Sequence, residues 1–364
     1  LRDLPFDEAH RLVHLGIEPL GETGYIDYRL SAHEISDWRE QQSTLESIAG
    51  FTNTSMNLSG VDEEPERVPG ARVTANAFQT LRVRPVIGRG FRSEEERPGA
   101  EPVVIIGHSL WENRYALDPS VLGRTVRVDG VSRTIVGVMP EGFRFPELQN
   151  IWVPLELDPT SVERGEGRFI HTFGRMVDNS SLDDVRVEYS ALGRRLELAY
   201  PNVYDGMRWR AIPYKEHFVD LNAVLIMNVM VGVVSFVLVI ACANVANLLL
   251  ARAAGRSREV AVRTALGASR MRVVGQMLVE SLIISLFGGA LGSALAYIGV
   301  HAFSTTLTPF LPFYWMDIRV DGTVLQFTFA LVLSSSVIAG TAPALKVTSV
   351  NVSTVLKDQA LGVA

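Results

Sequence analysis

Two long apolar runs, separated by an arginine-rich stretch, constrain the fold of this chain more than any other feature. The first run, residues 221–251, has no charged side chain, and the second, residues 273–300, has only Glu280. A helix that crosses the roughly 30 Å hydrocarbon core of a bilayer needs about 20 largely apolar residues. Both runs are long enough, so the sequence predicts membrane spans at about residues 223–251 and 273–300.

The stretch between the two runs sets the expected orientation of the spans. Residues 252–272 contain six arginines and one acid. Short loops rich in arginine remain in the cytoplasm, so we expect the far ends of both spans to face the opposite side of the membrane. A third run predicts a span at about residues 324–344, between Asp321 and Lys346, and the same rule places the tail that follows it in the cytoplasm.

Part of the arginine-rich stretch has the pattern of a short amphipathic helix. Apolar and charged side chains alternate at helical spacing from residue 256 to residue 266, and Gly267 follows where such a helix would end. One interpretation is a basic tether for anionic lipid headgroups, for which charge alone suffices. The other is a docking surface for a cytosolic partner, which a short, capped helix favours. The residues assigned to that surface are Arg256, Arg258, Glu259, Val262, Arg263 and Leu266.

Charge separates the chain into two predicted domains. Residues 1–220 carry 35 acidic and 25 basic side chains, a net charge of −10, whereas residues 221–364 carry 5 and 9, a net charge of +4. An acidic soluble head (1–220) joined to a basic membrane domain (221–358) accounts for this asymmetry. A head outside the cytoplasm followed by three spans requires one more span before Leu1, so we expect this chain to be a fragment without its N-terminal membrane helix.

The head alternates strand and helix patterns, which predicts an α+β domain. Its expected strands are residues 51–58, 66–74, 103–106, 168–176 and 207–213. Residues 125–138 predict a hairpin that turns at Asp129-Gly130. The expected helices cover about residues 36–48, 75–81 and 182–200, and another begins near His108. The membrane domain is expected to be entirely α-helical.

Polar and small residues inside the predicted spans point to helix packing. Asn244 and Asn247 lie in the first span, where an amide side chain usually bonds to a neighbouring helix. Gly288, Gly289 and Gly292 lie in the second span, at spacings that let helices approach closely. A substrate-binding role for the two amides stays open beside this structural one.

The sequence carries no motif for a catalytic or nucleotide-binding site. It has no G-x-x-x-x-G-K-[ST] phosphate loop, so any ATPase is expected on a separate subunit. Residues Gly107 to Trp111 superficially resemble a nucleophile elbow around Ser109, but Trp111 stands where the second glycine is required. His10 and His14 are expected to be a solvated pair, because no third metal ligand follows at suitable spacing. We expect no catalytic residue, cofactor, metal or nucleic-acid partner.

Five segments give the chain a family resemblance. They are EPERVPGARVTANAF, GRTVRVDGVSRTIVGVMPEGFRFP, VIACANVANLLLARAAGRSREVAVRTALGASR, ESLIISLFGGALG and GTAPALKVTSVNVSTVLKD. Over essentially its whole length, the chain resembles the MacB/FtsX-type permeases of the mechanotransmission ABC transporters, in which a MacB-like periplasmic core domain precedes an FtsX-like permease domain. It is most similar to the first half of the duplicated, ADOP-like permeases, where this block occurs twice.

The resemblance implies a multi-pass protein of the bacterial inner membrane with its N-terminal domain in the periplasm. The head is then expected to contain two subdomains, the second at about residues 85–155, and the first span to continue outward as a stalk. Residues 256–266 match the coupling helix that docks on a cytosolic ABC ATPase. The other expected partners are membrane lipid, a second permease block or protomer, and periplasmic or outer-membrane proteins.

Two functions are compatible with this resemblance. In the first, ATP hydrolysis by the partner subunit moves the periplasmic domain and drives efflux or export. In the alternative, the chain is a non-transporting membrane scaffold that regulates a periplasmic enzyme. The spans have few charged groups to line a pore, so a transporter of this kind would handle its substrate outside the membrane.

Overall fold

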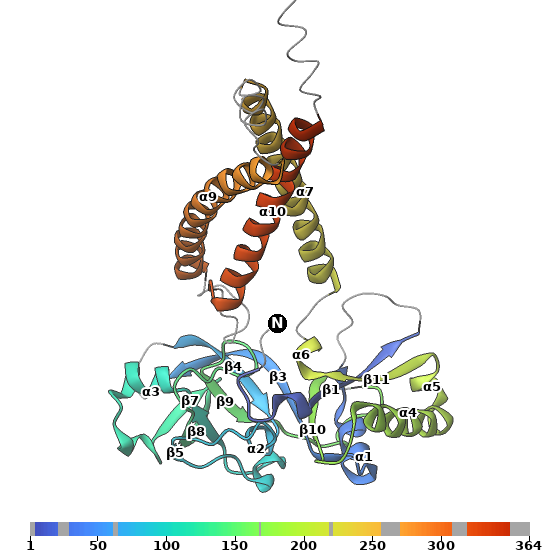
Figure 1. Ribbon diagram of the computed structural model, residues 1–364. Helices are drawn as coiled ribbons and strands as arrows, with labels where there is room; N and C mark the ends of the chain where they lie inside the picture. The colour runs from blue at the N-terminus through green and yellow to red at the C-terminus, as the bar shows by residue number, and fades with distance from the viewer. Residues whose placement is uncertain are drawn as a thin grey trace, which may run out of the picture. The chain divides into compact units, whose positions relative to one another are not determined.

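The computed structural model describes residues 4–20, 29–60, 65–166, 169–217, 221–255, 270–307 and 319–349. The chain divides into two compact units between Val224 and Leu225, which we name the head and the membrane domain. Figure 1 shows strands and short helices in the head and long helices in the membrane domain.

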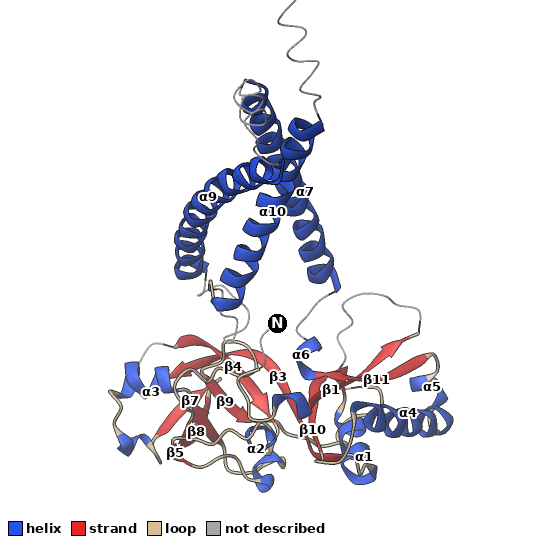
Figure 2. Ribbon diagram, viewed as in Figure 1, coloured by secondary structure: helices blue, strands red, loops and turns tan. Residues whose placement is uncertain are grey.

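A mixed sheet forms the body of the head (Figure 2). Its strands are β1 (Leu12–Pro19), β2 (Arg29–Leu30), β3 (Leu45–Ser59), β4 (Glu66–Val73), β5 (Ile87–Gly88), β6 (Val103–Ile106), β7 (Thr125–Val128), β8 (Val131–Val138), β9 (Ile151–Pro154), β10 (Ile170–Met176) and β11 (Met207–Pro213). The main path runs β11-β1-β10-β3-β4-β9-β6-β8-β5, while β2 pairs with β10, and β7 pairs with β3 and β8. The β4–β9 and β6–β8 pairs are parallel, unlike the others.

Short helices connect these strands and cover parts of the sheet. They are η1 (Ala9–Arg11), α1 (Ala32–Gln41), α2 (Ala77–Thr80), η2 (Ser93–Glu96), α3 (His108–Tyr115), η3 (Pro119–Val121), α4 (Leu182–Ala199), α5 (Pro201–Tyr204) and α6 (Tyr214–His217). A capping box starts α4: the Ser181 hydroxyl accepts from the Asp184 N–H, and the Asp184 carboxylate accepts from the Ser181 N–H at 2.8 Å. This pair satisfies two backbone groups that would otherwise lack partners.

Several local predictions are confirmed. The hairpin of β7 and β8 turns at Asp129 and Gly130, whose φ angles are 50° and 81°. Both are positive, as a two-residue turn between twisted strands requires. The apolar run Val103–Ile106 is strand β6 and is buried throughout. The predicted helix 182–200 is α4, which buries Val185, Tyr189, Leu192 and Leu196.

One helix prediction is wrong at its C-terminal end. Helix α1 stops at Gln41, and residues from Leu45 onward belong to β3. The register of β3 against β10 shifts, because Met176 pairs with Leu45 and Arg175 pairs with Ser47. This bulge places Leu45 and Ile48 in the same core cluster despite a spacing of three residues. In the sequence, apolar residues three positions apart are typical of a helix, which explains the error.

Among the described residues, the core of the head consists of three apolar clusters. One lies among α1, α4 and β11 and includes Trp38, one is rich in aromatic side chains and includes Trp152, and the third includes Val104. Strands β5 to β9, from the predicted second subdomain, join the same sheet as the rest of the head. His14 lies on β1 and is 1% exposed, so the prediction of a solvated His10–His14 pair is wrong for His14.

The membrane domain contains three long helices among its described residues. They are α7 (Leu221–Gly255), α9 (Arg270–Leu307) and α10 (Gly322–Ser349). Within them, Val224–Val245 and Leu278–Thr306 are long and apolar enough to cross a bilayer. The apolar segment of α10, Gly322–Val337, is shorter. The chain is therefore a mixed α/β domain followed by helices, and its third span stays a prediction.

Candidate functional site

The predicted docking surface lies between Gly255 and Arg270, the last residue of α7 and the first residue of α9. Its residues, Arg256, Arg258, Glu259, Val262, Arg263 and Leu266, lie outside the described residues. The helices on either side of it are described: α7 ends at Gly255, and α9 begins at Arg270. Docking by this stretch stays a prediction from the sequence.

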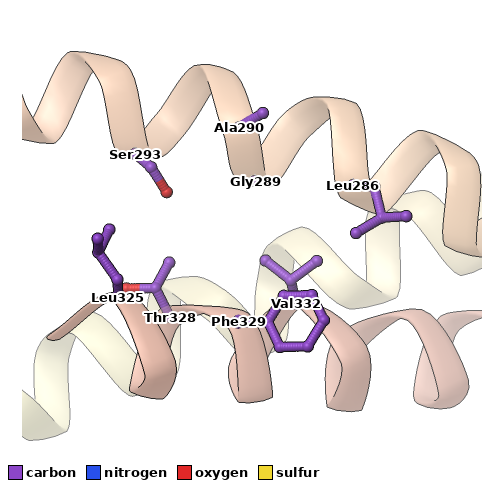
Figure 3. A pocket seen from close by; sticks show the side chains of 8 residues that line it. All are labelled: Leu286, Gly289, Ala290, Ser293, Leu325, Thr328, Phe329 and Val332. Atoms are coloured by element: carbon purple, nitrogen blue, oxygen red, sulfur yellow. The ribbon is translucent and has the colours of Figure 1, made fainter. Parts of the chain in front are cut away.

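Helices α9 and α10 meet along one seam of the membrane domain (Figure 3). The facing residues recur every three or four positions on each helix, which is the spacing of one helical face, and they line a pocket of about 210 Å³. They are Leu286, Gly289, Ala290 and Ser293 on α9, and Leu325, Thr328, Phe329 and Val332 on α10. None of these side chains is charged, so the lining suits helix packing or an apolar molecule rather than acid–base chemistry.

Two contacts hold this seam together. Gly289 lies at a close approach of the helices, because a Cβ atom built on it would be 2.6 Å from Cγ2 of Val332. The hydroxyl of Ser281 donates a 3.0 Å hydrogen bond to the carbonyl oxygen of Ser336, and both serines are buried. A small residue on one helix and a hydroxyl–carbonyl bond between helices are common means of association in membranes.

The other residues predicted for helix packing lie away from this seam. A Cβ atom on Gly288 or Gly292 would meet nothing within 4 Å in the described part of the chain. Asn244 and Asn247 are exposed on α7. Successive residues of a helix point about 100° apart, so spacing alone could not select Gly289 from its neighbours. A packing role for the other four residues stays a prediction.

Replacing Gly289 with alanine should weaken the α9–α10 seam. The added methyl group would overlap the Val332 side chain, so that side chain or one of the two helices must move, at a cost of about 1–3 kcal/mol. Thermal unfolding of the purified chain in detergent, followed by circular dichroism, would show a lower midpoint temperature.

Two further variants control this experiment. Gly292→Ala adds the same methyl group where nothing lies within 4 Å among the described residues, so it should leave the midpoint unchanged or raise it. Val332→Ala combined with Gly289→Ala should recover most of the loss, because it removes the overlapping atoms. Equal midpoints for the wild type and Gly289→Ala would contradict the close approach.

The head contains a buried polar cluster that the sequence did not reveal. The carboxylate of Glu34, which is 3% exposed, accepts hydrogen bonds from the Tyr204 hydroxyl and, at 2.6 Å, from the Ser31 N–H. Burial and the nearby Glu34 raise the pKa of Tyr204 above its usual value. Arg164 donates to the Tyr204 hydroxyl at 3.3 Å and pairs with Asp37 at 2.6 Å. These contacts join α1 to α5 and to the segment around Arg164. We therefore assign the cluster a structural role.

The remaining candidates for chemistry in the head have structural partners. The Ser109 hydroxyl donates to Oδ1 of Asn150 at 2.9 Å, whereas a serine nucleophile needs a base at that position. Among the residues that the structure describes, no group of three or more His, Cys, Asp or Glu side chains is placed to hold a metal ion.

Comparisons with known proteins match both parts of the chain. The family model of the MacB-like periplasmic core domain matches residues 3–190, and that of the FtsX-like permease C-terminal domain matches residues 231–352. The macrolide export ATP-binding/permease protein MacB of Bdellovibrio bacteriovorus is 25% identical over 327 residues, covering 87% of this chain and 48% of that protein. The ABC transporter permease YknZ of Bacillus subtilis is 27% identical over 260 residues, covering 70% of this chain and 62% of that protein.

A solved structure also matches. The periplasmic region of MacB from Actinobacillus actinomycetemcomitans aligns with 56% of this chain and 89% of its own, at 14% identity and a TM-score of 0.42. The chain spans about half the length of the MacB protein from Bdellovibrio. Because the periplasmic core model alone matches residues 3–190 of 364 and the permease model matches most of the rest, this chain belongs to the MacB/FtsX-type ABC transporter permeases.

Proposed function

We propose that this permease subunit transmits mechanical work from a separate cytosolic ABC ATPase to its periplasmic head and thereby drives export. The observation that carries the proposal is the order of its parts: α7 follows the head and leads into the arginine-rich stretch, and α9 follows that stretch. Helix α7 has 35 residues, a length of roughly 52 Å at 1.5 Å per residue. It exceeds the roughly 30 Å hydrocarbon core and so could serve as a stalk.

The proposal assigns a place to each part of the chain. Residues 1–220 form the periplasmic domain, and residues 221–358 form the permease domain with α10 as a third span. The six arginines of residues 252–272 favour a cytosolic position for this stretch. Without a phosphate loop in the sequence, ATP hydrolysis is assigned to the partner subunit.

Further partners follow from the exposed surfaces of the membrane domain. Helix α7 exposes large apolar side chains, including Val231 (65%) and Phe236 (69%), which need lipid or another helix around them. Gly288 and Gly292 offer a close approach to such a helix. We assign these surfaces to lipid and to a second permease block or protomer. Several relatives are named as export proteins, among them a macrolide export protein and a probable syringafactin export protein.

Reversing two arginines of the predicted coupling helix should abolish binding of the ATPase. Arg258→Glu with Arg263→Glu changes the charge of that helix by −4, which turns attraction to an acidic surface into repulsion. The measurement is capture of a co-expressed ABC ATPase from the same organism on the tagged full chain in detergent. We expect at least a tenfold loss of captured ATPase.

A matched variant separates docking from a lipid tether. Arg270→Glu with Arg272→Glu changes the charge of the same stretch by the same amount but lies outside residues 256–266. Docking predicts that this control retains the ATPase, whereas a stretch that only contacts lipid headgroups predicts unchanged capture of the ATPase by both variants. Unchanged capture by Arg258→Glu/Arg263→Glu would refute the docking proposal.

A further inference from the structure

Three histidines from distant parts of the sequence meet in the head. His14 comes from β1, His171 from β10 and His217 from α6. The rings of His14 and His217 are stacked with centroids 3.8 Å apart and an angle of 18° between their planes. The His171 ring meets that of His217 edge to face at 5.6 Å. The contact therefore joins α6 to two strands of the sheet.

The surroundings of this histidine cluster favour an uncharged ring at His217. His14 is 1% exposed and His217 is 8% exposed. Aromatic rings complete the site: Phe51 stacks on His171 at 5.0 Å, and Tyr214 lies 6.4 Å from His14. Burial, together with the proximity of His171, lowers the pKa of His217 to about 3. A proton on His217 would place a charge at a buried site and beside two other rings that can also become positive.

Charged groups also lie on the described elements around the cluster. They are Lys215 and Glu216 on α6, Glu18 on β1, Arg175 on β10, Arg208 and Arg210 on β11, Glu46 on β3, and Glu147 in the loop before β9. Glu18 is the only carboxylate on β1, β10 and β11, and it already pairs with Arg208 and Arg210. Glu46 pairs with Arg11, and Glu147 accepts a hydrogen bond from Asn53.

On α6 itself, Lys215 and Glu216 are exposed. Glu216 precedes His217 directly in the helix, and adjacent helical residues do not face each other. Arg175 is a buried positive charge on β10, four residues from His171, so it supplies no counter-charge to the cluster.

We propose that the histidine cluster is an acid-sensitive latch: its neutral form holds α6 on the sheet, and protonation releases α6. The release matters because α6 is the last described helix of the head before α7 in the chain. Freeing its four residues would lengthen the connection to α7 by roughly 14 Å when extended. The latch is a property of the head and does not depend on the transport proposal.

The size of the expected effect follows from proton linkage. A released His217 regains an ordinary histidine pKa of about 6.5, whereas the latched one has a lowered pKa. The latched state therefore requires neutral His217. The latched state loses stability relative to the released state as the pH falls below 6.5 toward 3. When the pH is lowered from 7.5 to 5, protonation of His217 alone should raise the equilibrium constant for release of α6 about thirtyfold.

Hydrogen–deuterium exchange of the full chain in lipid nanodiscs tests the latch. After correction for the intrinsic pH dependence of exchange, the protection of a peptide covering α6 should fall about thirtyfold between pH 7.5 and pH 5. A peptide covering β6 should keep its protection, because the rest of the head stays folded. His217→Phe preserves a stacked ring without a titratable group. The change in α6 protection between the two pH values should therefore be at least three times smaller in this variant than in the wild type. His10→Asn, at an exposed position of η1, should behave as the wild type.

Three results would overturn the latch. They are constant protection of α6 in the wild type, an equal pH dependence in the wild type and His217→Phe, and a parallel loss at β6, which would mean global acid unfolding. If His217→Phe does not fold, His217→Leu replaces it, and the wild-type comparison of α6 with β6 still decides between local release and global unfolding.

Discussion

Gly193→Ala should destabilise the head by about 3 kcal/mol, although alanine in the interior of a helix normally stabilises by about 1 kcal/mol over glycine. Gly193 lies in α4 and is buried against the indole of Trp209 on β11. A Cβ atom on Gly193 would be 2.5 Å from Nε1 of Trp209 and closer still to its Cγ and Cδ1 atoms. The steric overlap therefore outweighs the gain in helix propensity.

Trp209 cannot easily move away from an added methyl group. Its ring packs edge to face on Tyr189 at 5.1 Å and against Tyr204 at 5.5 Å. Tyr189 is itself fully buried and stacked on Trp38 at 3.8 Å. A shift of Trp209 would disturb this whole row of rings, and packed interiors resist such shifts.

Urea unfolding of the full chain in mild detergent, followed by tryptophan fluorescence, measures this loss. Arg194→Ala, at the next and exposed position of α4, is the matched control and should change the free energy of unfolding by less than about 0.5 kcal/mol. Trp209→Leu in the Gly193→Ala background should recover part of the stability by making space. A Gly193→Ala chain as stable as the wild type would show that α4 and β11 are not packed this closely.

Local rules predicted much of the secondary structure of the head. The Asp129-Gly130 turn and the apolar run 103–106 carry their own signals, because positive φ angles and continuous burial restrict the residues that fit. The helix over residues 182–200 was equally clear, since its buried side chains repeat along one face. These elements are confirmed almost residue by residue.

Features that depend on distant residues escaped prediction. The bulge in β3 that puts Leu45 and Ile48 on one side arises from pairing with β10, more than a hundred residues later in the chain. The parallel pairing of β4 with β9 produces no recognisable pattern in the sequence of either strand. His14 was expected to be solvated, yet β10 and α6 bury it. In each case, the deciding neighbour is far away in the sequence.

The same limit applies to the membrane domain. The glycines of residues 288–292 predicted a close approach of helices, but only the position of Val332 on α10 shows that Gly289 makes one. The apolar runs predicted long helices, and α7 and α9 contain segments that are long enough to span. The docking role proposed for Arg258 and Arg263 depends on a second protein, and a single chain carries no direct record of its partner.

The proposed relay of force requires that the coupling helix and the head lie on opposite sides of the membrane. Single cysteines at Arg263 and at Leu198, an exposed residue of α4 (85%), report the two sides in a chain whose native cysteine is removed by Cys242→Ala. Intact spheroplasts are treated with a maleimide that cannot cross the membrane. We predict that the cysteine at 198 is labelled at once and that the cysteine at 263 reacts only after permeabilisation. Labelling of both positions in intact spheroplasts, or protection of both, would contradict the account.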